Sequence, residues 1–122
     1  MKKSEMVICL GFLFKGYPNS QLDVRDTVER YYQAFGWIDK DVFSFLVMDY
    51  MDKKTKYFPS VFEFNALINE EREKAKRILE DPRNAYYEKI SPEAAERRAS
   101  KLRRAEYILK ALSAEERKFI KQ

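Results

Sequence analysis

KYFPSVFEF, residues 56–64, sets four aromatic side chains around a single proline in the middle of the chain. Ser60 and Glu63 have the spacing of a capping box, in which each side chain bonds to the other residue's backbone N–H, so a helix is predicted to start at Val61. Pro59 biases the residue before it toward extended backbone. The stretch therefore predicts a sharp corner into a capped helix, with the rings holding the direction of that helix against a helical bundle.

The rings of this corner cannot all face the same core. Phe62 lies two residues before Phe64, which is about 200° around a helix. We expect Phe58 and Phe64 to point inward and Phe62 to point outward. Packing alone is the common role of aromatic residues at a helix joint, and the alternative is that the exposed ring of Phe62 anchors a partner protein.

Three helices are predicted before the corner. Apolar residues recur at helical spacing over residues 4–15, and a second helix follows, capped by Asp23 or Ser20. Asp39 is a good N-cap for a third helix over residues 40–54. The predicted apolar side of the second helix consists of Leu22, Val24, Val28, Tyr31, Tyr32 and Phe35.

Helices also dominate the sequence after the corner. Asp81 and Pro82 break the fourth helix, and the RNAYYEKI segment that follows is ambiguous but compatible with one helical turn. Ser91, followed by Pro92 at the first helical position, predicts a fifth helix that runs to about Leu112.

The chain is therefore predicted to be all-α. Ser113 and Glu116 form a second capping box and predict a short terminal helix. Nearly all strongly apolar residues lie in the first half, so we expect a compact four-helix N-terminal core over residues 1–80, followed by a charged helical C-terminal extension over residues 81–122.

The composition argues against several kinds of chemistry. The chain has 122 residues, no histidine and a single cysteine, Cys9. The commonest metal ligand and the usual neutral-pH base are missing, and an internal disulfide is impossible. No phosphate-binding glycine loop, nucleophile elbow or zinc spacing occurs. We therefore expect no metal site, no cofactor and no enzymatic activity.

The apolar N-terminal run has some but not all features of a signal peptide. Lys2 and Lys3 precede MVICLGFLF, but Glu5 lies in the would-be basic region, Gly11 interrupts the run and no small-residue cleavage site follows. No stretch approaches the ~20 apolar residues of a membrane span. We expect a cytoplasmic protein.

The excess of positive charge lies in the second half. Residues 1–69 hold nine Lys and Arg against nine Asp and Glu, whereas residues 70–122 hold fifteen against eleven. The densest basic cluster is Arg97, Arg98, Lys101, Arg103 and Arg104. Arg97, Lys101 and Arg104 share one helical face, and Leu102, Ala105, Leu109 and Leu112 share another. The basic face is either solvated or contacts phosphates or an acidic protein.

A series of aromatic, branched and proline residues runs through about residues 6–68: Tyr17-Pro18, Leu22, Val24, Tyr31-Tyr32, Val42, Phe43, Leu46, Tyr50, Tyr57-Phe58-Pro59-Ser60 and Glu63. In these residues the first half resembles the replicative-helicase loader and inhibitor proteins of phages. The resemblance implies a helical N-terminal domain with a tyrosine-proline corner and a later aromatic-proline corner. Residues 91–122 depart from the family, whose C-terminal region is flexible, because here they are predicted to be well-capped helix.

The resemblance implies a function that is not enzymatic. Proteins of this family bind the ring-shaped replicative helicase, hold it off ATP hydrolysis or deliver it to an origin, and also contact an initiator protein. We expect a DNA-replication accessory protein that engages a helicase mainly through residues 70–122. The candidate partner-binding residues are Phe62, Arg97, Lys101, Arg104 and Leu109.

Two other functions remain open. The chain is alternatively a small basic nucleic-acid-binding protein that uses Arg97, Lys101 and Arg104. The third reading is a structural subunit that self-associates through leucines of the last long helix, Leu102, Leu109 and Leu112.

Overall fold

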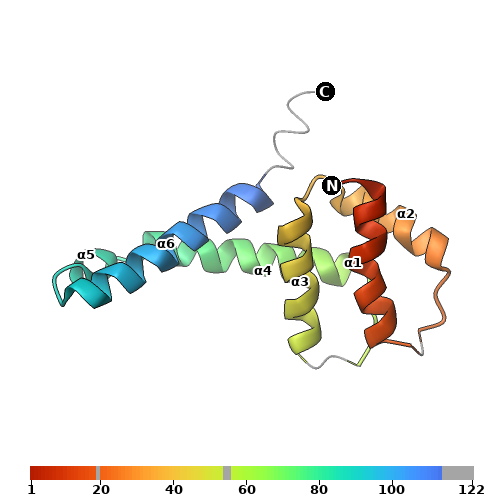
Figure 1. Cartoon of the computed structure of the whole chain (residues 1–122), viewed down its shortest axis with the longest axis horizontal. Helices are drawn as coiled ribbons and strands as arrows, with labels where there is room; N and C mark the ends of the chain where they lie inside the picture. Colours follow the sequence, from red (N-terminus) through yellow and green to blue (C-terminus); the bar gives the residue numbers. More distant parts are fainter. Residues whose placement is uncertain (19, 54–55, 114–122) are drawn as a thin grey trace.

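The computed structural model describes residues 1–18, 20–53 and 56–113 and confirms the all-α fold class. These residues form helices and no strand. Figure 1 shows the helices α1 (Lys3–Gly16), α2 (Val24–Phe35), α3 (Lys40–Asp52), α4 (Val61–Glu80), α5 (Asn84–Tyr87) and α6 (Pro92–Leu112). The short helix predicted from Ser113 and Glu116 lies beyond the described residues.

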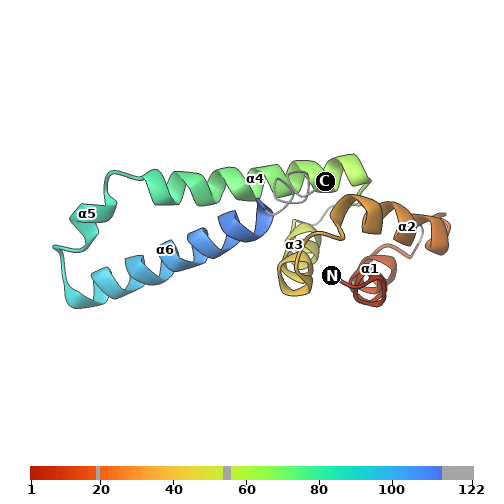
Figure 2. The same ribbon diagram turned by 90° about the horizontal axis from the view of Figure 1, so that it is seen from above.

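The helices are arranged as a compact head and a long arm. The head consists of α1, α2, α3 and the first turns of α4 (Figure 1). The rest of α4 leaves the head, and α6 runs back beside it after the single turn of α5 (Figure 2). Leu112, at the end of α6, is fully buried in the core of the head, and Ile108 packs against that core. Both long helices of the arm are therefore joined to the head, α4 at its start and α6 at its end.

Helices α2, α3, α4 and α6 begin at predicted capping residues, whereas α1 begins at Lys3, one residue before the predicted range 4–15, with Lys2 as its N-cap. The side chain of Asp23 accepts a hydrogen bond from the backbone N–H of Asp26 at 2.9 Å, so Asp23 rather than Ser20 is the N-cap of α2. Asp39 caps α3 and Ser91 caps α6 in the same way. Each side chain satisfies a backbone donor that has no partner inside its helix.

A cluster of four rings forms the centre of the head. Phe64 is fully buried, and its ring centroid lies 5.0 Å from that of Phe43, 5.2 Å from Phe35 and 5.8 Å from Tyr31. These rings come from α2, α3 and α4. Phe64 is thus the side chain through which α4 packs on the other helices of the head, as its predicted inward orientation requires.

The corner before α4 is held by rings and by two tyrosine hydroxyls. Phe58 is half-buried, with its centroid 5.0 Å from Phe14 and 6.1 Å from Tyr31. The Tyr31 hydroxyl donates to the carbonyl of the buried Pro59, and burial raises the pKa of that hydroxyl. The Tyr50 hydroxyl donates to the carbonyl of Tyr57 at 2.9 Å. Two backbone carbonyls of the corner are therefore satisfied by side chains from α2 and α3.

The predicted apolar side of the second helix is wrong at its start. Leu22 and Val24 are 45% and 56% exposed. Leu22 precedes the N-cap, and Val24 occupies the first helical position, where the chain has not yet reached the core. Val28, Tyr31 and Phe35, one or more turns further on, are buried as predicted.

The division of the chain at residue 80 stays a prediction about independent folding. The boundary coincides with the end of α4, but residues before it and residues after it pack against each other. Leu112 belongs to the core of the head, and Ala75 of α4 and Ala105 of α6 are both buried in the arm. Small side chains at these two positions allow the helices to approach closely.

The three phenylalanines of the corner should differ in their effect on stability. We predict that Phe64→Ala lowers the free energy of unfolding by about 3–5 kcal/mol, because it leaves a cavity among three rings. Phe58→Ala should cost less, because its ring is only partly buried, and Phe62→Ala should stay within about 0.5 kcal/mol of wild type. Denaturant unfolding of the three variants measures the order, and a Phe62→Ala variant less stable than Phe64→Ala would contradict it.

Candidate protein-binding surface

A groove with a volume of about 740 Å³ runs between α2 and the corner that begins α4. Its apolar lining comes from Leu22 before α2, Ala34 at the end of α2, and the corner residues Phe58, Val61 and Phe62. These residues belong to two segments far apart in sequence, which the Tyr31–Pro59 hydrogen bond holds together. The groove is a preformed apolar depression at the surface of the head.

Phe62 stands at one wall of this groove with 82% of its surface exposed. It lies in the first turn of α4, which the capping box fixes. The backbone N–H of Glu63 donates to Ser60 Oγ at 3.0 Å, and the N–H of Ser60 donates to Glu63 Oε1 at 3.3 Å. An exposed ring on a capped turn is costly to leave in water and is already positioned for contact, as anchor residues of interfaces are.

The opposite wall of the groove is polar. Asp23 is occupied as the N-cap of α2, and Asp26 pairs with Arg30 at 3.1 Å. All three residues line the groove. The arrangement of an apolar floor with a polar rim fits a protein segment that inserts an apolar side chain.

The predicted basic residues of α6 form a row along the arm. Arg97, Lys101 and Arg104 are exposed, and no carboxylate among the described residues lies within 4 Å of them. Lys101 and Arg104 lie at the junction where the arm meets the head. The Arg104 guanidinium lies 5.1 Å from the centroid of the Phe45 ring on α3. The row therefore starts at the head and continues toward the tip of the arm.

The junction between the arm and the head also holds a carboxylate. Glu71 of α4 is buried and pairs with Lys74 at 3.4 Å, and this attraction raises the pKa of the Lys74 amine. Both residues line a small hollow of about 220 Å³ together with Lys101 and Arg104. The negative charge of Glu71 inside this junction attracts the positive charges of Lys101 and Arg104 at its edge.

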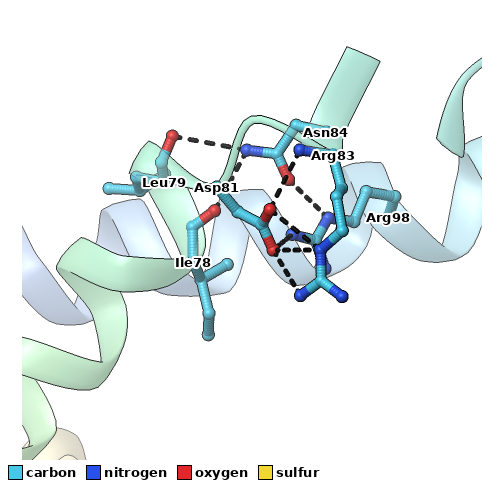
Figure 3. Close-up of polar contacts among 6 residues, drawn as sticks. All are labelled: Ile78, Leu79, Asp81, Arg83, Asn84 and Arg98. Atoms are coloured by element: carbon cyan, nitrogen blue, oxygen red, sulfur yellow. Dashed lines mark hydrogen bonds and ion pairs between the residues drawn. The ribbon is translucent and has the colours of Figure 1, made fainter. Parts of the chain in front are cut away.

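Two other arginines of the basic cluster have partners within the chain. Arg98 is turned inward with a 10% exposed side chain (Figure 3). Its Nε donates to Asn84 Oδ1 at 2.6 Å and its Nη2 lies 3.2 Å from Asp81 Oδ2. Arg103 pairs with Glu96 at 3.7 Å. Arg98 is thus a structural residue, and only part of the cluster remains available to a partner.

The inward arginine closes the tip of the arm. Asn84 Nδ2 donates to the carbonyls of Ile78 and Leu79 at 3.0 and 3.3 Å, which satisfies the end of α4 (Figure 3). Asp81 accepts from both Arg83 and Arg98. Hydrogen bonds from Arg83 are the main cause that holds the pKa of Asp81 well below its usual range.

The leucines of α6 that are candidates for self-association are partly or fully covered within the chain. Leu112 is fully buried, and Leu102 and Leu109 are half-buried in the contact between α6 and α4. The packing of α6 along α4 therefore uses part of the stripe within the chain, and self-association through these leucines stays a prediction. Leu109 is therefore a weaker candidate for partner binding than Phe62.

The remaining site predictions can be placed on the structure. Phe62 and the basic row are about 20 Å apart along α4, since 13 residues separate Phe62 from Ala75 beside Arg104. The structure therefore forms two separate surfaces from the predicted residues. In the described part of the chain, no group of acidic, cysteine or histidine side chains is arranged to hold a metal, and no helix is long and apolar enough to cross a membrane.

Comparison with known proteins gives no relative. The chain matches no protein-family model, and neither the curated proteins nor the solved structures contain a significant match to it. The function is therefore inferred from the surfaces described above.

Two residues of these surfaces were missed in the sequence. Leu22 was assigned to the core although it precedes the N-cap Asp23, and this position was the available sign that it lies outside the helix. Phe45 was not named among the candidate residues, although it lies on another side of the third helix than the buried Phe43, Leu46 and Val47, and it is 38% exposed.

The stability contributed by the Asp81–Arg98 clasp, the hydrogen bonds of Asp81 with Arg83 and Arg98 at the tip of the arm, should depend on pH. Because its pKa is lowered in the folded state, Asp81 stabilises the protein above its unfolded pKa, and this contribution is lost as the pH falls through the folded value. We predict that Asp81→Asn is less stable than wild type at pH 7 and that the difference narrows progressively below about pH 4. Thermal melts across this range measure it, and a constant difference would contradict the assignment.

Proposed function

We propose that this protein is a non-enzymatic accessory protein that binds another protein through the groove beside Phe62. The observation that carries the proposal is the combination of a largely exposed ring with a preformed apolar groove on a rigid, capped corner. Among the residues that the structure describes, Phe62 is 82% exposed, so packing within them does not explain this large ring on an ordered turn. Burying such a side chain contributes about 1.5–3 kcal/mol to an interface.

A replicative helicase is the first partner to test. The residues that resemble the phage helicase loader and inhibitor proteins include Tyr57, Phe58, Pro59, Ser60 and Glu63, which form the corner that carries Phe62. On this proposal the protein acts in DNA replication, in the cytoplasm of the host, and loads or inhibits the helicase. The arm with its basic row supplies a second, electrostatic contact to the same partner.

Phe62→Ala should weaken binding to the replicative helicase of the host. Loss of a central aromatic anchor reduces affinity by about 30-fold or more. Tyr57→Ala is the matched control, because Tyr57 is a similarly exposed aromatic residue of the same corner, at 77%, and does not line the groove. Calorimetric titration of the purified helicase with wild type and both variants measures the effect.

The outcome separates three cases. Weaker binding for Phe62→Ala with near-normal binding for Tyr57→Ala supports the groove. Equal affinities for all three proteins would contradict the role of Phe62, and absence of any binding by wild type would contradict the helicase as the partner. Thermal melts of the same samples show that each variant is folded.

A second candidate function is nucleic-acid binding by the arm. The observation in its favour is the row of Arg97, Lys101 and Arg104, whose charges no carboxylate of the described residues offsets within 4 Å. Against it, the row holds only three cations and carries no base-reading motif. Binding through the row would be weak and independent of sequence.

The salt dependence of DNA binding should reflect the length of this row. Three phosphate contacts predict a slope of about −3 in a plot of log affinity against log salt concentration. We expect weak binding at physiological salt and loss of the slope in a variant with Arg97, Lys101 and Arg104 changed to Gln. Fluorescence anisotropy with duplex DNA measures both, and tight, sequence-selective binding at physiological salt would overturn the ranking.

A further inference from the structure

Helix α1 is apolar around nearly its whole circumference but is covered on only one side. Met6, Leu10 and Leu13 are buried in the core. Val7, Ile8 and Phe12 are each about half exposed. A helix that is apolar all round is normally buried on all sides. The outer side of α1 is therefore a surface that the head leaves uncovered.

The uncovered side continues onto α3. The two helices lie parallel, because Cys9 Sγ contacts Ser44 Oγ at 3.3 Å and Gly16, seven residues later, lies against Met51, seven residues after Ser44. Both contacts have the same offset along the chain, so the helices run side by side in one direction, as Figure 1 shows.

Helical spacing assigns four large side chains to one outer face. Ile8 and Phe12 lie on the side of α1 turned away from the core, next to α3. Phe45 and Met48 lie on the corresponding side of α3, 38% and 50% exposed. The outer face of the α1–α3 pair is thus an apolar surface built from two parallel helices.

At one end of the helix pair, the two edges of this face carry opposite charges. Lys15 lies on the α1 edge and Asp52 on the α3 edge, near the same end of the pair. With the offset between the helices, Lys15 is level with Tyr50, and Asp52 is about 3 Å further along. Both side chains are exposed, and neither has an ion-pair partner within 4 Å among the described residues. At this end of the helix pair, the positive charge of one edge is complementary to the negative charge of the other.

We propose that the α1–α3 face is the contact surface for a second copy of this chain, related by a two-fold axis parallel to the two helices. This axis lays α1 of each copy over α3 of the other. Phe12 then meets Met48 of the other copy, and Lys15 meets Asp52 of the other copy, each contact occurring twice, as a two-fold interface requires.

The charge of the arms favours this axis over the alternative. The arm leaves the head on the α3 side, away from α1 (Figures 1 and 2). An axis parallel to the helices sends the two arms in opposite directions. An axis perpendicular to the helices would place both basic arms on the same side and would set α1 against α1, so that Lys15 finds no Asp52. The positive charges of the two arms would then lie on the same side and repel each other.

The first test is the concentration dependence of the molecular mass. Sedimentation velocity of the full chain from about 10 to about 500 µM should show a shift from monomer to dimer, as expected for a modest apolar interface. Phe12→Gln should shift the dissociation constant upward by about tenfold or more. Phe62→Ala is the matched control, because it removes an exposed phenylalanine outside this face, and it should leave the dimer unchanged. This control also keeps the test independent of the proposed function.

The second test uses the two edges. Lys15→Asp alone and Asp52→Lys alone place like charges at both contacts and should each weaken self-association by about tenfold. An equimolar mixture of the two variants should dimerise, because in the mixed pair every position-15 residue meets an opposite charge at position 52. The double variant should also recover self-association.

The results can overturn the proposal in three ways. A monomer at every concentration, or a dimer that Phe12→Gln leaves unchanged, excludes this face as the contact. A mixture of the two charge variants that stays as weak as each variant alone excludes the parallel axis. Circular dichroism melts of all variants show that they are folded, as expected for changes at exposed positions.

Discussion

The hydrogen bond from the Tyr31 hydroxyl to the Pro59 carbonyl fixes the point at which α4 enters the head. Proline leaves its carbonyl as the only polar group of its backbone, and Pro59 is buried, so this carbonyl needs a partner from within the chain. Tyr31 supplies it while its ring packs against Phe58 and Phe64 on the two sides of the corner. The capping box then starts the helix in a fixed direction. The position of Phe62, the groove and the arm all follow from this direction.

Helix α4 joins two structures with different kinds of packing. At its start Phe64 meets large rings, and further along Ala75 of α4 and Ala105 of α6 are buried where the two helices of the arm pack together. A pair of helices buries little apolar surface, so the arm depends on its two ends: Leu112 in the core and the Asp81–Arg98 clasp at the tip. Most charged side chains of the arm lie at its surface. Arg98 is turned inward instead, because it forms the clasp at the tip.

Local chemistry made much of the fold predictable. The caps at Asp23, Asp39, Ser60 and Ser91, and the break at Asp81, use residues that bond to their own neighbours, so sequence alone predicts them. The outward position of Phe62 followed from helical spacing. The inward turn of Arg98 and the uncovered side of α1 depend on which helices meet in space. The sequence pattern does not contain that information, because an apolar stripe shows that a face needs a partner and not which segment provides it.

The central claim is that the Tyr31–Pro59 hydrogen bond holds the corner, and the free energy of unfolding of Tyr31→Phe tests it most directly. This variant keeps the ring and leaves the buried carbonyl without its donor. The account predicts a loss of about 1–3 kcal/mol in urea denaturation. Tyr107→Phe, at an exposed position on the arm, should stay within about 0.5 kcal/mol of wild type. A Tyr31→Phe variant as stable as Tyr107→Phe would contradict the claim.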